Sequence, residues 1–400
     1  MNRQVITLNA GSSSIKFALF ELDGGVPAAG AVGLVEMLGK LRRITVRDGA
    51  GAPIYEDAWP DAAGAPFHIE ALRRVLAWRL GAFPDANVVA AGHRVVHGGI
   101  RYDGPALVTD EVLGYLETLT PFAPLHQVHN IAGMLAAREA WPDMRQVACF
   151  DTAFHRKHPF VNDVFALPRL FYDEGVRRYG FHGLSYEYMT EKLRQVAPLQ
   201  AAGRVVVAHL GNGASMCAIL NGRSIASSMG FTPLDGLPMG TRCGQLDPGV
   251  VLYLMQEKKM SAEAIADLLY RESGLKGLSG LSHDMRELEA SDQPEAKQAI
   301  EYFVFRIQRE LGGLTGALKG LDAVVFCGGI GENAWQVRER VLESMGWIGI
   351  ELDHIANQRN EQVISSASSR VHVFVIPTNE EAMIARQTLA VLDHTVAAAA

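Results

Sequence analysis

A strand–turn–strand pattern that occurs once in each half of the chain constrains the fold more than any other feature. In the first half, two apolar runs at residues 5–8 and 15–20 flank the polar turn 9–14. In the second half, apolar runs at 205–210 and 216–220 flank a glycine-containing turn. Apolar runs separated by Gly, Ser and Asn predict two strands that meet at a turn. Because internal repetition is the sequence signature of a duplicated architecture, the pattern predicts two related domains.

The segments between and after the repeats alternate between helix-like and strand-like periodicity. Amphipathic helices are predicted at 69–80, 110–119, 185–196, 248–257, 262–270, 295–318 and after the glycine turn 328–333 to about 345. Buried strands are predicted at 88–90, 93–96, 146–150, 323–326 and 371–376. Thr378 and Glu381 have the spacing of a capping box that opens a last helix. This alternation predicts the α/β class.

The length of the chain also favours two domains. A chain of 400 residues is too long for one compact core. We expect an N-terminal domain at 1–150 and a C-terminal domain at 151–380, with the last helix, at about 381–396, packing back on the N-terminal domain.

Composition excludes several function classes. The 44 acidic residues outnumber the 37 Lys and Arg, and no basic tract is interleaved with aromatic residues, so we expect no nucleic-acid partner. The N-terminal apolar stretch is too short for a signal peptide, and no apolar run is long enough to span a bilayer, so we expect no membrane partner. The four cysteines are scattered, which argues against a disulfide framework or a thiolate metal site. These features predict a cytoplasmic protein.

Three glycine-rich segments at strand ends favour nucleotide binding. The turn 9–14, with Lys16 just beyond it, offers hydroxyl groups and backbone N–H groups to phosphate oxygens, although an exposed hairpin turn is an equal alternative. It lacks the order of a Walker A loop. The segments 209–213 and 328–333 each lack a glycine of the dinucleotide fingerprint. Taken together, the three segments favour a nucleotide held between two like domains.

Charged residues gather beside glycines and at one strand end. Arg94 and Arg242 stand in glycine-rich loops, where each is either a solvated surface residue or a ligand for a planar anion. His182 is flanked by glycine, and the segment 284–286 is either a helix start or part of a nucleotide rim. Asp151 follows the predicted strand 146–150, at the end where α/β sheets bind ligands, although a helix N-cap is the alternative.

Taken together, these residues resemble the acetate kinase (acetokinase) family of the sugar kinase/Hsp70/actin superfamily. The similarity extends from the block 8–17 to the block 377–381, and the intervening blocks are 92–99, 150–155, 179–183, 209–213, 229–242, 279–288 and 328–333. The resemblance implies two duplicated ribonuclease-H-like domains, as in actin-like ATPases, with a central nucleotide cleft. It implies reversible transfer of a phosphoryl group from ATP to acetate, which gives acetyl phosphate and ADP, with Mg²⁺ or Mn²⁺ as the metal. The family also implies a homodimer.

The resemblance assigns roles to residues at matching positions. The catalytic residues are Asp151, His182 and Arg242. The substrate site is Arg94 for the carboxylate and an apolar wall of Val96, Leu125, Phe181 and Pro233. The metal ligands are Asn9 and Glu380, the latter chosen over Glu381 because of the expected capping box. The ATP contacts are Lys16, His209, Leu210, Gly211, Asn212, Gly213, Asp284, Met285, Arg286, Gly329, Ile330, Gly331, Glu332 and Asn333.

The charge of acetate decides the expected role of Asp151. Acetate is already an anion at neutral pH and has no proton to lose, so we expect Asp151 to orient Arg94, Arg242 or a metal-bound water rather than to act as a base.

Two other functions compete with acetate kinase. The nearer rival is a propionate or butyrate kinase with a roomier pocket, and of these two propionate is the closer competitor. The rival from another class is an actin- or Hsp70-like ATPase that binds a protein partner.

Overall fold

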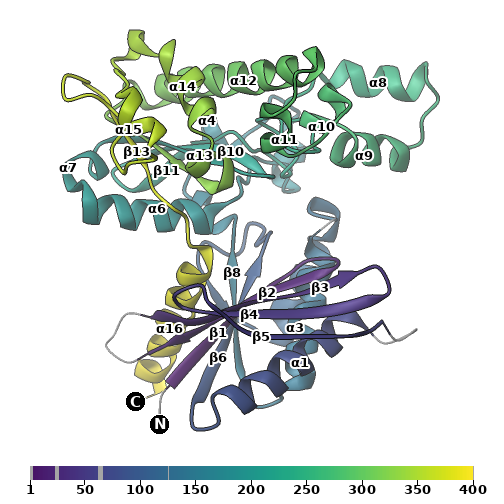
Figure 1. Cartoon of the computed structure of the whole chain (residues 1–400). Coiled ribbons are helices and arrows are strands. Elements are labelled where there is room, and N and C mark those ends of the chain that lie inside the picture. The colour runs from purple at the N-terminus through teal and green to yellow at the C-terminus, as the bar shows by residue number, and fades with distance from the viewer. Residues whose placement is uncertain (1–2, 23–26, 62–65, 125, 400) are drawn as a thin grey trace. The chain divides into compact units, whose positions relative to one another are not determined.

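The computed structural model shown in Figure 1 describes residues 3–22, 27–61, 66–124 and 126–399, with the backbone alone described for 394–399. The chain divides into two compact units. Unit 1 consists of Met1–Arg156 and Asn379–Ala400, and unit 2 consists of Lys157–Thr378. The predicted domain division at residues 150 and 380 stays a prediction, and the compact units place 151–156 and 379–380 with unit 1.

Unit 1 is built on one sheet with the strand order β5-β4-β3-β2-β1-β6-β8-β7. Its strands are β1 (Arg3–Ala10), β2 (Ser14–Glu21), β3 (Ala28–Leu38), β4 (Leu41–Asp48), β5 (Pro53–Pro60), β6 (Asn87–Val95), β7 (Ala106–Leu107) and β8 (Arg145–Phe150). Its helices are α1 (Phe67–Ala82), α2 (Asp110–Thr118), α3 (Gln127–Ala140) and α16 (Glu380–Ala399), with short 3-10 turns at Thr120–Phe122 and Ala153–His155.

Helices cover both faces of the unit 1 sheet, because successive strand residues point to opposite faces. On β6, Ala91 belongs to the apolar core that includes Leu72 of α1 and Ala137 of α3. The next residue, Gly92, faces α16, since a Cβ atom there would lie 2.2 Å from the Thr388 hydroxyl oxygen. Glycine is therefore required at residue 92 so that the C-terminal helix can pack against the N-terminal sheet (Figure 1).

Unit 2 holds a second sheet with the order β11-β10-β9-β12-β13. Its strands are β9 (Arg204–Leu210), β10 (Ala214–Leu220), β11 (Arg223–Ser227), β12 (Ala323–Cys327) and β13 (His372–Val375). Its helices are α4 (Phe160–Asp163), α5 (Arg169–Asp173), α6 (Gly183–Val196), α7 (Pro198–Ala201), α8 (Pro248–Gln256), α9 (Ala262–Arg271), α10 (Gly274–Ser279), α11 (Met285–Glu289), α12 (Pro294–Leu318), α13 (Gly328–Asn333), α14 (Trp335–Glu343) and α15 (His354–Gln358), with a 3-10 turn at Gly346–Ile348. The long helix α12 lies on one face of this sheet and α6 on the other (Figure 1).

The two sheets repeat one topology, as the internal repeat predicts. β1 and β2 are antiparallel, and β1, β6 and β8 are parallel neighbours. β9 and β10 are likewise antiparallel, and β9, β12 and β13 are parallel neighbours. The predicted α/β class and the duplicated actin-like fold are therefore confirmed.

Several local predictions are wrong. The two strands predicted at 88–90 and 93–96 form the single strand β6, because Ala91 and Gly92 continue the extended backbone under the helices. The segment 328–333 is the helix α13 rather than a turn, and the next helix is separate. The sequence pattern predicts no element between residues 28 and 60, where β3, β4 and β5 lie. β5 is mostly exposed, so it lacks the apolar alternation that signals a strand.

Candidate active site

In unit 1, a buried ion pair joins the carboxyl ends of two neighbouring parallel strands. Arg94 of β6 pairs in register with Cys149 of β8, and Asp151 follows directly after β8. Nε of Arg94 donates to both carboxylate oxygens of Asp151 at 3.2 Å, and Nη2 donates to Oδ2 at 2.8 Å. The Asp151 side chain is 1% exposed and that of Arg94 is 20% exposed. A two-atom contact of this kind fixes the plane of the guanidinium group.

Glu380 is the second carboxylate beside Arg94. Its Oε2 lies 3.6 Å from Nη1 of Arg94, and it is the first residue of α16. The expected capping box is wrong: the Asn379 side chain accepts from the Ala382 N–H at 2.9 Å and caps the helix. The Thr378 hydroxyl lies instead 3.0 Å from the hydroxyl of Ser185. The reason for choosing Glu380 over Glu381 is therefore removed, and Glu380 as a metal ligand stays a prediction.

The electrostatics of this group follow from burial and from its two carboxylates. Burial acts against the positive charge of Arg94, but Asp151 and Glu380 outweigh it and raise the pKa of Arg94 above its ordinary value. Burial raises the pKa of Asp151, and Glu380 adds to the rise, although Arg94 opposes it. Arg94 thus stays charged, while Asp151 takes up a proton at a higher pH than an ordinary aspartate does.

The β1–β2 turn is tied to the end of β6 by Asn130, which the sequence analysis does not single out. The Asn130 amide donates to the Ala10 carbonyl at 3.1 Å, and its oxygen accepts from the Val96 N–H at 3.0 Å. Asn130 is 3% exposed on α3. Gln127 and Asn130 are the polar residues among the buried positions of α3, and polar residues on that face are the signal that could have found Asn130. Asn9 and Lys16 stand opposite each other where β1 and β2 meet this turn.

The metal ligands expected from the sequence are both in unit 1 and carry oxygen donors. Asn9 is the second-last residue of β1, beside the β1–β2 turn. Glu380 is the first residue of α16, a helix that packs on β1. An amide oxygen and a carboxylate are hard ligands of the type that Mg²⁺ prefers, and Mg²⁺ commonly keeps several waters beside one or two protein ligands. The donor chemistry therefore fits a magnesium ion, which Asn9 and Glu380 would hold through their side-chain oxygens.

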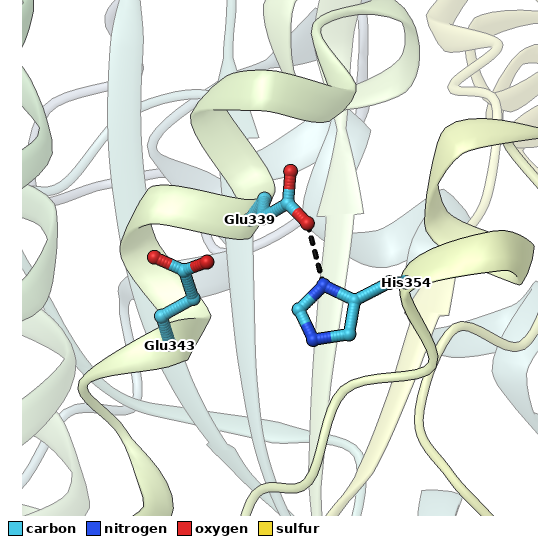
Figure 2. Close-up of side chains that lie close together, drawn as sticks. All are labelled: Glu339, Glu343 and His354. Atoms are coloured by element: carbon cyan, nitrogen blue, oxygen red, sulfur yellow. Dashed lines mark hydrogen bonds and ion pairs between the residues drawn. The ribbon is translucent and has the colours of Figure 1, made fainter.

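A different group of metal-type side chains lies on the surface of unit 2. Within the described part of the chain, Glu339, Glu343 and His354 are the one group of three His, Cys, Asp or Glu residues whose ligand atoms all lie within 4.8 Å of one another. Figure 2 shows the two glutamates on successive turns of α14 with His354 opposite them. Nδ1 of His354 lies 2.5 Å from Oε1 of Glu339, so a hydrogen bond accounts for this contact. None of the three was expected from the sequence.

In unit 2, His182 is held in a strained conformation immediately before α6. Its φ of 57° is in the left-handed region, which costs a residue with a side chain about 1–3 kcal/mol. Its ring stacks on that of His209 with a centroid distance of 4.4 Å. A Cβ atom built on Gly213 would lie 3.3 Å from Nε2 of His182 and 3.9 Å from Nη1 of Arg242. The glycine turn, the histidine and the arginine thus meet at one place.

A backbone carbonyl holds the Arg242 side chain in place. Its Nη1 donates to the carbonyl of Pro233 at 3.1 Å, which ties the arginine to one residue of the expected apolar wall. Phe181, beside His182, is 1% exposed. In unit 1, Val96 is 6% exposed. Leu125 lies outside the described residues. The acyl pocket that these four residues were expected to form stays a prediction.

One pocket in unit 2 collects three segments that are far apart in the sequence. Its volume is about 810 Å³, and it is open to solvent. Eight of the residues expected to contact ATP line it: Gly211, Asn212, Asp284, Met285, Arg286, Gly329, Ile330 and Asn333. Sequence reasoning missed its other walls, which are His283, Glu289, Ala290, Ala334, Trp335 and Gln336. A volume of this size is typical of small-molecule and cofactor sites.

The remaining expected ATP residues of unit 2 do not line this pocket. Five residues of the two glycine segments are not among its walls: His209, Leu210, Gly213, Gly331 and Glu332. The Glu332 carboxylate accepts from the Gly328 N–H at 2.8 Å and from the Thr378 N–H at 3.0 Å. Glu332 therefore holds the turn at the start of α13 against the segment that leads to α16. Its contact with ATP stays a prediction.

Comparison with known proteins identifies the family. The sequence pattern that defines the Acetokinase family matches residues 4–386. A curated acetate kinase of Methylocella silvestris is 74% identical, and the match covers 100% of both chains. The chain belongs to the acetokinase family. An acetate kinase of Rhodopseudomonas palustris is 52% identical over 98% of this chain and 99% of the relative.

Solved structures agree with this acetokinase assignment. The crystal structure of Porphyromonas gingivalis acetate kinase is 36% identical, covers 98% of this chain and 100% of its own, and has a TM-score of 0.88. A propionate kinase from Francisella tularensis has the same identity, 36%, and the same TM-score, 0.88, with 96% of this chain and 98% of its own chain covered. The family resemblance seen in the sequence is confirmed. This acetokinase is an enzyme that transfers a phosphoryl group to a carboxylate.

Proposed function

We propose that this acetokinase catalyses the reversible, Mg²⁺-dependent transfer of the terminal phosphoryl group of ATP to acetate, which forms acetyl phosphate and ADP. The observation that carries the proposal is the pocket of about 810 Å³, because its walls come from the three segments that the sequence assigned to ATP. Family membership and a relative of 74% identity, itself an acetate kinase, support the same acceptor.

In the proposed reaction, unit 1 supplies the group that binds the acceptor. Arg94 pairs with the acetate carboxylate, and Asp151 holds the guanidinium by three hydrogen bonds so that it cannot rotate. Because the carboxylate of acetate attacks as an anion, no base has to remove a proton. Asp151 is therefore a positioning residue for Arg94. Val96, Leu125, Phe181 and Pro233 remain the proposed apolar wall around the methyl group.

Unit 2 supplies the groups that bind the phosphoryl donor and its transition state. Negative charge spreads over the equatorial oxygens of a phosphoryl group in transfer, and fixed cations and N–H donors stabilise that charge. Arg242, fixed by the Pro233 carbonyl, and His182, fixed before α6, are the proposed donors. Lys16 and the glycine segments contact the phosphates of ATP. Mg²⁺ held by Asn9 and Glu380 would neutralise phosphate charge.

The test is the formation of acyl phosphate, trapped as the hydroxamate, from ATP and Mg²⁺ with acetate, propionate and butyrate in turn. We expect the highest kcat/KM with acetate and a lower one with propionate, since one methylene changes binding in an apolar pocket by about 1–3 kcal/mol. Arg94→Ala should raise the KM for acetate, and Arg101→Ala, at a half-exposed arginine on the Tyr115 ring, serves as the matched control. Higher efficiency with propionate would contradict the acceptor, and ATP hydrolysis that ignores every acid would contradict the reaction.

We also propose that the enzyme is a homodimer. Helix α8 has no buried residue, and four of its large apolar side chains are exposed: Val250, Leu252, Tyr253 and Met255. A second copy of the chain would remove this apolar face from water. Light scattering should give twice the mass of the chain for the native protein and a smaller mass for Leu252→Glu. A monomeric native protein would contradict the proposal.

The remaining expectations about the cell stay proposals. Within the described residues, no helix combines the length and the apolar character needed to cross a bilayer. The four cysteines are thiols rather than disulfides. Thiols are the usual state in a reducing compartment, which supports the proposed cytoplasmic location. The absence of nucleic-acid and membrane partners is likewise proposed from the sequence alone.

A further inference from the structure

Two stacked histidines of unit 2 are each held at the same ring nitrogen by a serine hydroxyl. Nδ1 of His182 lies 2.8 Å from Oγ of Ser215, and Nδ1 of His209 lies 2.8 Å from Oγ of Ser185. Ser215 also lies 2.5 Å from the hydroxyl of Tyr186. Tyr186, Ser215 and His182 therefore form a chain of hydrogen-bonding groups that ends at the imidazole.

All three members of this chain are removed from water. Ser215 and Tyr186 are 0% exposed and His182 is 9% exposed. Ser215 comes from β10, whereas His182 and Tyr186 stand four residues apart, before and on α6. Because a strand and a helix supply the groups, the geometry depends on rigid elements rather than on a loop.

A neutral imidazole carries one proton, on Nε2 or on Nδ1, and each place favours its own order of donors along the chain. If Tyr186 donates to Ser215, the serine proton is directed at Nδ1 of His182, and the imidazole carries its own proton on Nε2. In the reverse order Nδ1 carries the proton and Nε2 presents a lone pair. Burial raises the pKa of Tyr186 well above its ordinary value, so the phenol keeps its proton and can donate.

The surroundings of Nε2 favour the first order. Nε2 of His182 and Nη1 of Arg242 both lie within 4 Å of the place that a side chain on Gly213 would occupy. A guanidinium group at that place marks it as suited to an anion. A lone pair on Nε2 would repel the oxygens of such an anion, whereas an N–H would bind them.

We propose that Tyr186 and Ser215 are positioning residues that hold His182 in the tautomer with its proton on Nε2, where it donates to the phosphoryl group in transfer. The inference rests on the proposed role of His182 in catalysis. It adds that the hydroxyl groups of Tyr186 and Ser215 act in turnover although neither touches a substrate.

The kinetic test compares variants that remove one hydroxyl each. Ser215→Ala should lower kcat about 10- to 100-fold, as expected for a misoriented donor, and should leave both KM values within about threefold. Tyr186→Phe should lower kcat less, and the double variant should be no slower than Ser215→Ala because both hydroxyls act through one imidazole. Ser215→Thr, which keeps a hydroxyl, should recover most of kcat.

A matched control separates positioning from packing. Ser224 is also a buried serine of unit 2 bonded to a histidine ring, with Oγ 2.7 Å from Nε2 of His158. Ser224→Ala should cost similar stability in urea unfolding and leave kcat unchanged. Equal kcat values for Ser215→Ala and Ser224→Ala would overturn the inference.

The tautomer itself can be measured in the native enzyme. In protein labelled with ¹⁵N-histidine, His182 should show a protonated Nε2 and an unprotonated Nδ1, and its signals are those absent from His182→Asn. A proton on Nδ1 would overturn the inference even if Ser215→Ala does not fold. If His182→Asn retains full kcat, the proposed role of His182 fails; if His182→Asn is slow but Ser215→Ala is not, only the positioning chain fails.

Discussion

The two units share one strand topology, but unit 1 has charged side chains at two strand positions where unit 2 has apolar ones. In unit 1 the Asp151 N–H donates to the Val95 carbonyl, and in unit 2 the Ile376 N–H donates to the Phe326 carbonyl, each at 3.0 Å. Counted from these two bonds at the carboxyl ends of the strands, Ile376 takes the place of Asp151 and Val325 takes the place of Arg94. Val325 and Ile376 are buried apolar residues.

The comparison predicts that the sheet does not need the ion pair in order to fold. Unit 2 fills the same two places with apolar side chains, and a buried ion pair seldom stabilises a fold more than well-packed apolar residues do. This supports the proposed role of the Arg94–Asp151 pair in binding the acceptor. Unit 2 instead places its polar groups on the β9–β10 turn and on the start of α6, around His182.

The largest effect is expected at Arg242, the cation that we assign to the transition state. Arg242→Ala should lower kcat by about 10³- to 10⁵-fold, because an arginine on a phosphoryl group in transfer is worth that much in rate. The KM for acetate should change little. Steady-state kinetics in the hydroxamate assay measure both values, and a rise in KM with kcat preserved would place Arg242 in substrate binding instead.

The comparison itself is tested by giving unit 1 the residues of unit 2. Arg94→Val alone should lower the free energy of unfolding by about 3–5 kcal/mol, because it leaves the Asp151 carboxyl buried and unpaired. Arg94→Val combined with Asp151→Ile should restore or exceed the native stability while the activity stays lost. Urea unfolding and the hydroxamate assay decide between these outcomes. A double variant less stable than the single one would show that the pair is needed for the fold.

The pocket of unit 2 is tested at Gly329. A Cβ atom there would have no other atom within 4 Å, so Gly329→Val should fold normally and fill space that ATP needs. We expect the KM for ATP to rise about tenfold, a loss of about 1.4 kcal/mol, with little change in the KM for acetate. Gly313→Ala on α12, which also meets no atom within 4 Å, is the control and should change neither KM. An unchanged KM for ATP in Gly329→Val would place the nucleotide elsewhere.

The raised pKa of Asp151 predicts the acid side of the pH profile. As the pH falls through this raised pKa, Asp151 takes up a proton and Arg94 loses the charged partner that orients it. The KM for acetate should therefore begin to rise at a higher pH than an ordinary aspartate would cause, and this rise should be missing in Asp151→Asn. The effect on stability has the opposite pH dependence to the effect on binding. Because the pKa of Asp151 is higher in the folded than in the unfolded state, this carboxyl favours the folded state at low pH, and that contribution is lost as the pH rises.

The smallest effect is expected at the surface group of unit 2. Glu343→Gln should leave the Mg²⁺ concentration for half-maximal activity unchanged, because the Glu339, Glu343 and His354 group is separate from the proposed ligands. Glu380→Gln should raise that concentration, because it removes the carboxylate ligand of the pair. If Glu343→Gln changed the Mg²⁺ concentration for half-maximal activity and Glu380→Gln did not, the surface group would be the metal site and Glu380 would not be a ligand.

Prediction from the sequence succeeded where the signal is local. The two strand–turn–strand segments, the strand that ends before Asp151 and the long helix ending at Leu318 follow from runs of apolar residues that the chain shows directly. Motif blocks that cover the chain also identified the family. Of the three missed strands, β5 is largely exposed and has no burial period. β3 and β4 do bury every second residue, but the buried positions include Ala31, Gly33 and Arg42, which are not residue types that signal a strand.

Prediction was incomplete where a role depends on contacts between distant residues. Thr378 has the spacing of a helix cap, yet Asn379 caps α16 while the Thr378 hydroxyl contacts Ser185. Glu332 has the position of a nucleotide contact, yet its carboxylate binds two backbone N–H groups. Asn130 joins two strand ends that are 34 and 120 residues away from it in the sequence. No local pattern distinguishes such residues from ordinary polar ones.

The sequence alone determined the α/β class, the duplication, the family and the residue types available for phosphoryl transfer. It could do so because periodicity and motif spacing are properties of neighbouring residues. Only the tertiary structure decided that Arg94 is locked by Asp151, that three distant segments share one pocket, and that a tyrosine and a serine stand behind His182. Hydrogen bonds and burial act over a few ångströms of space, and folding alone brings those partners within that distance.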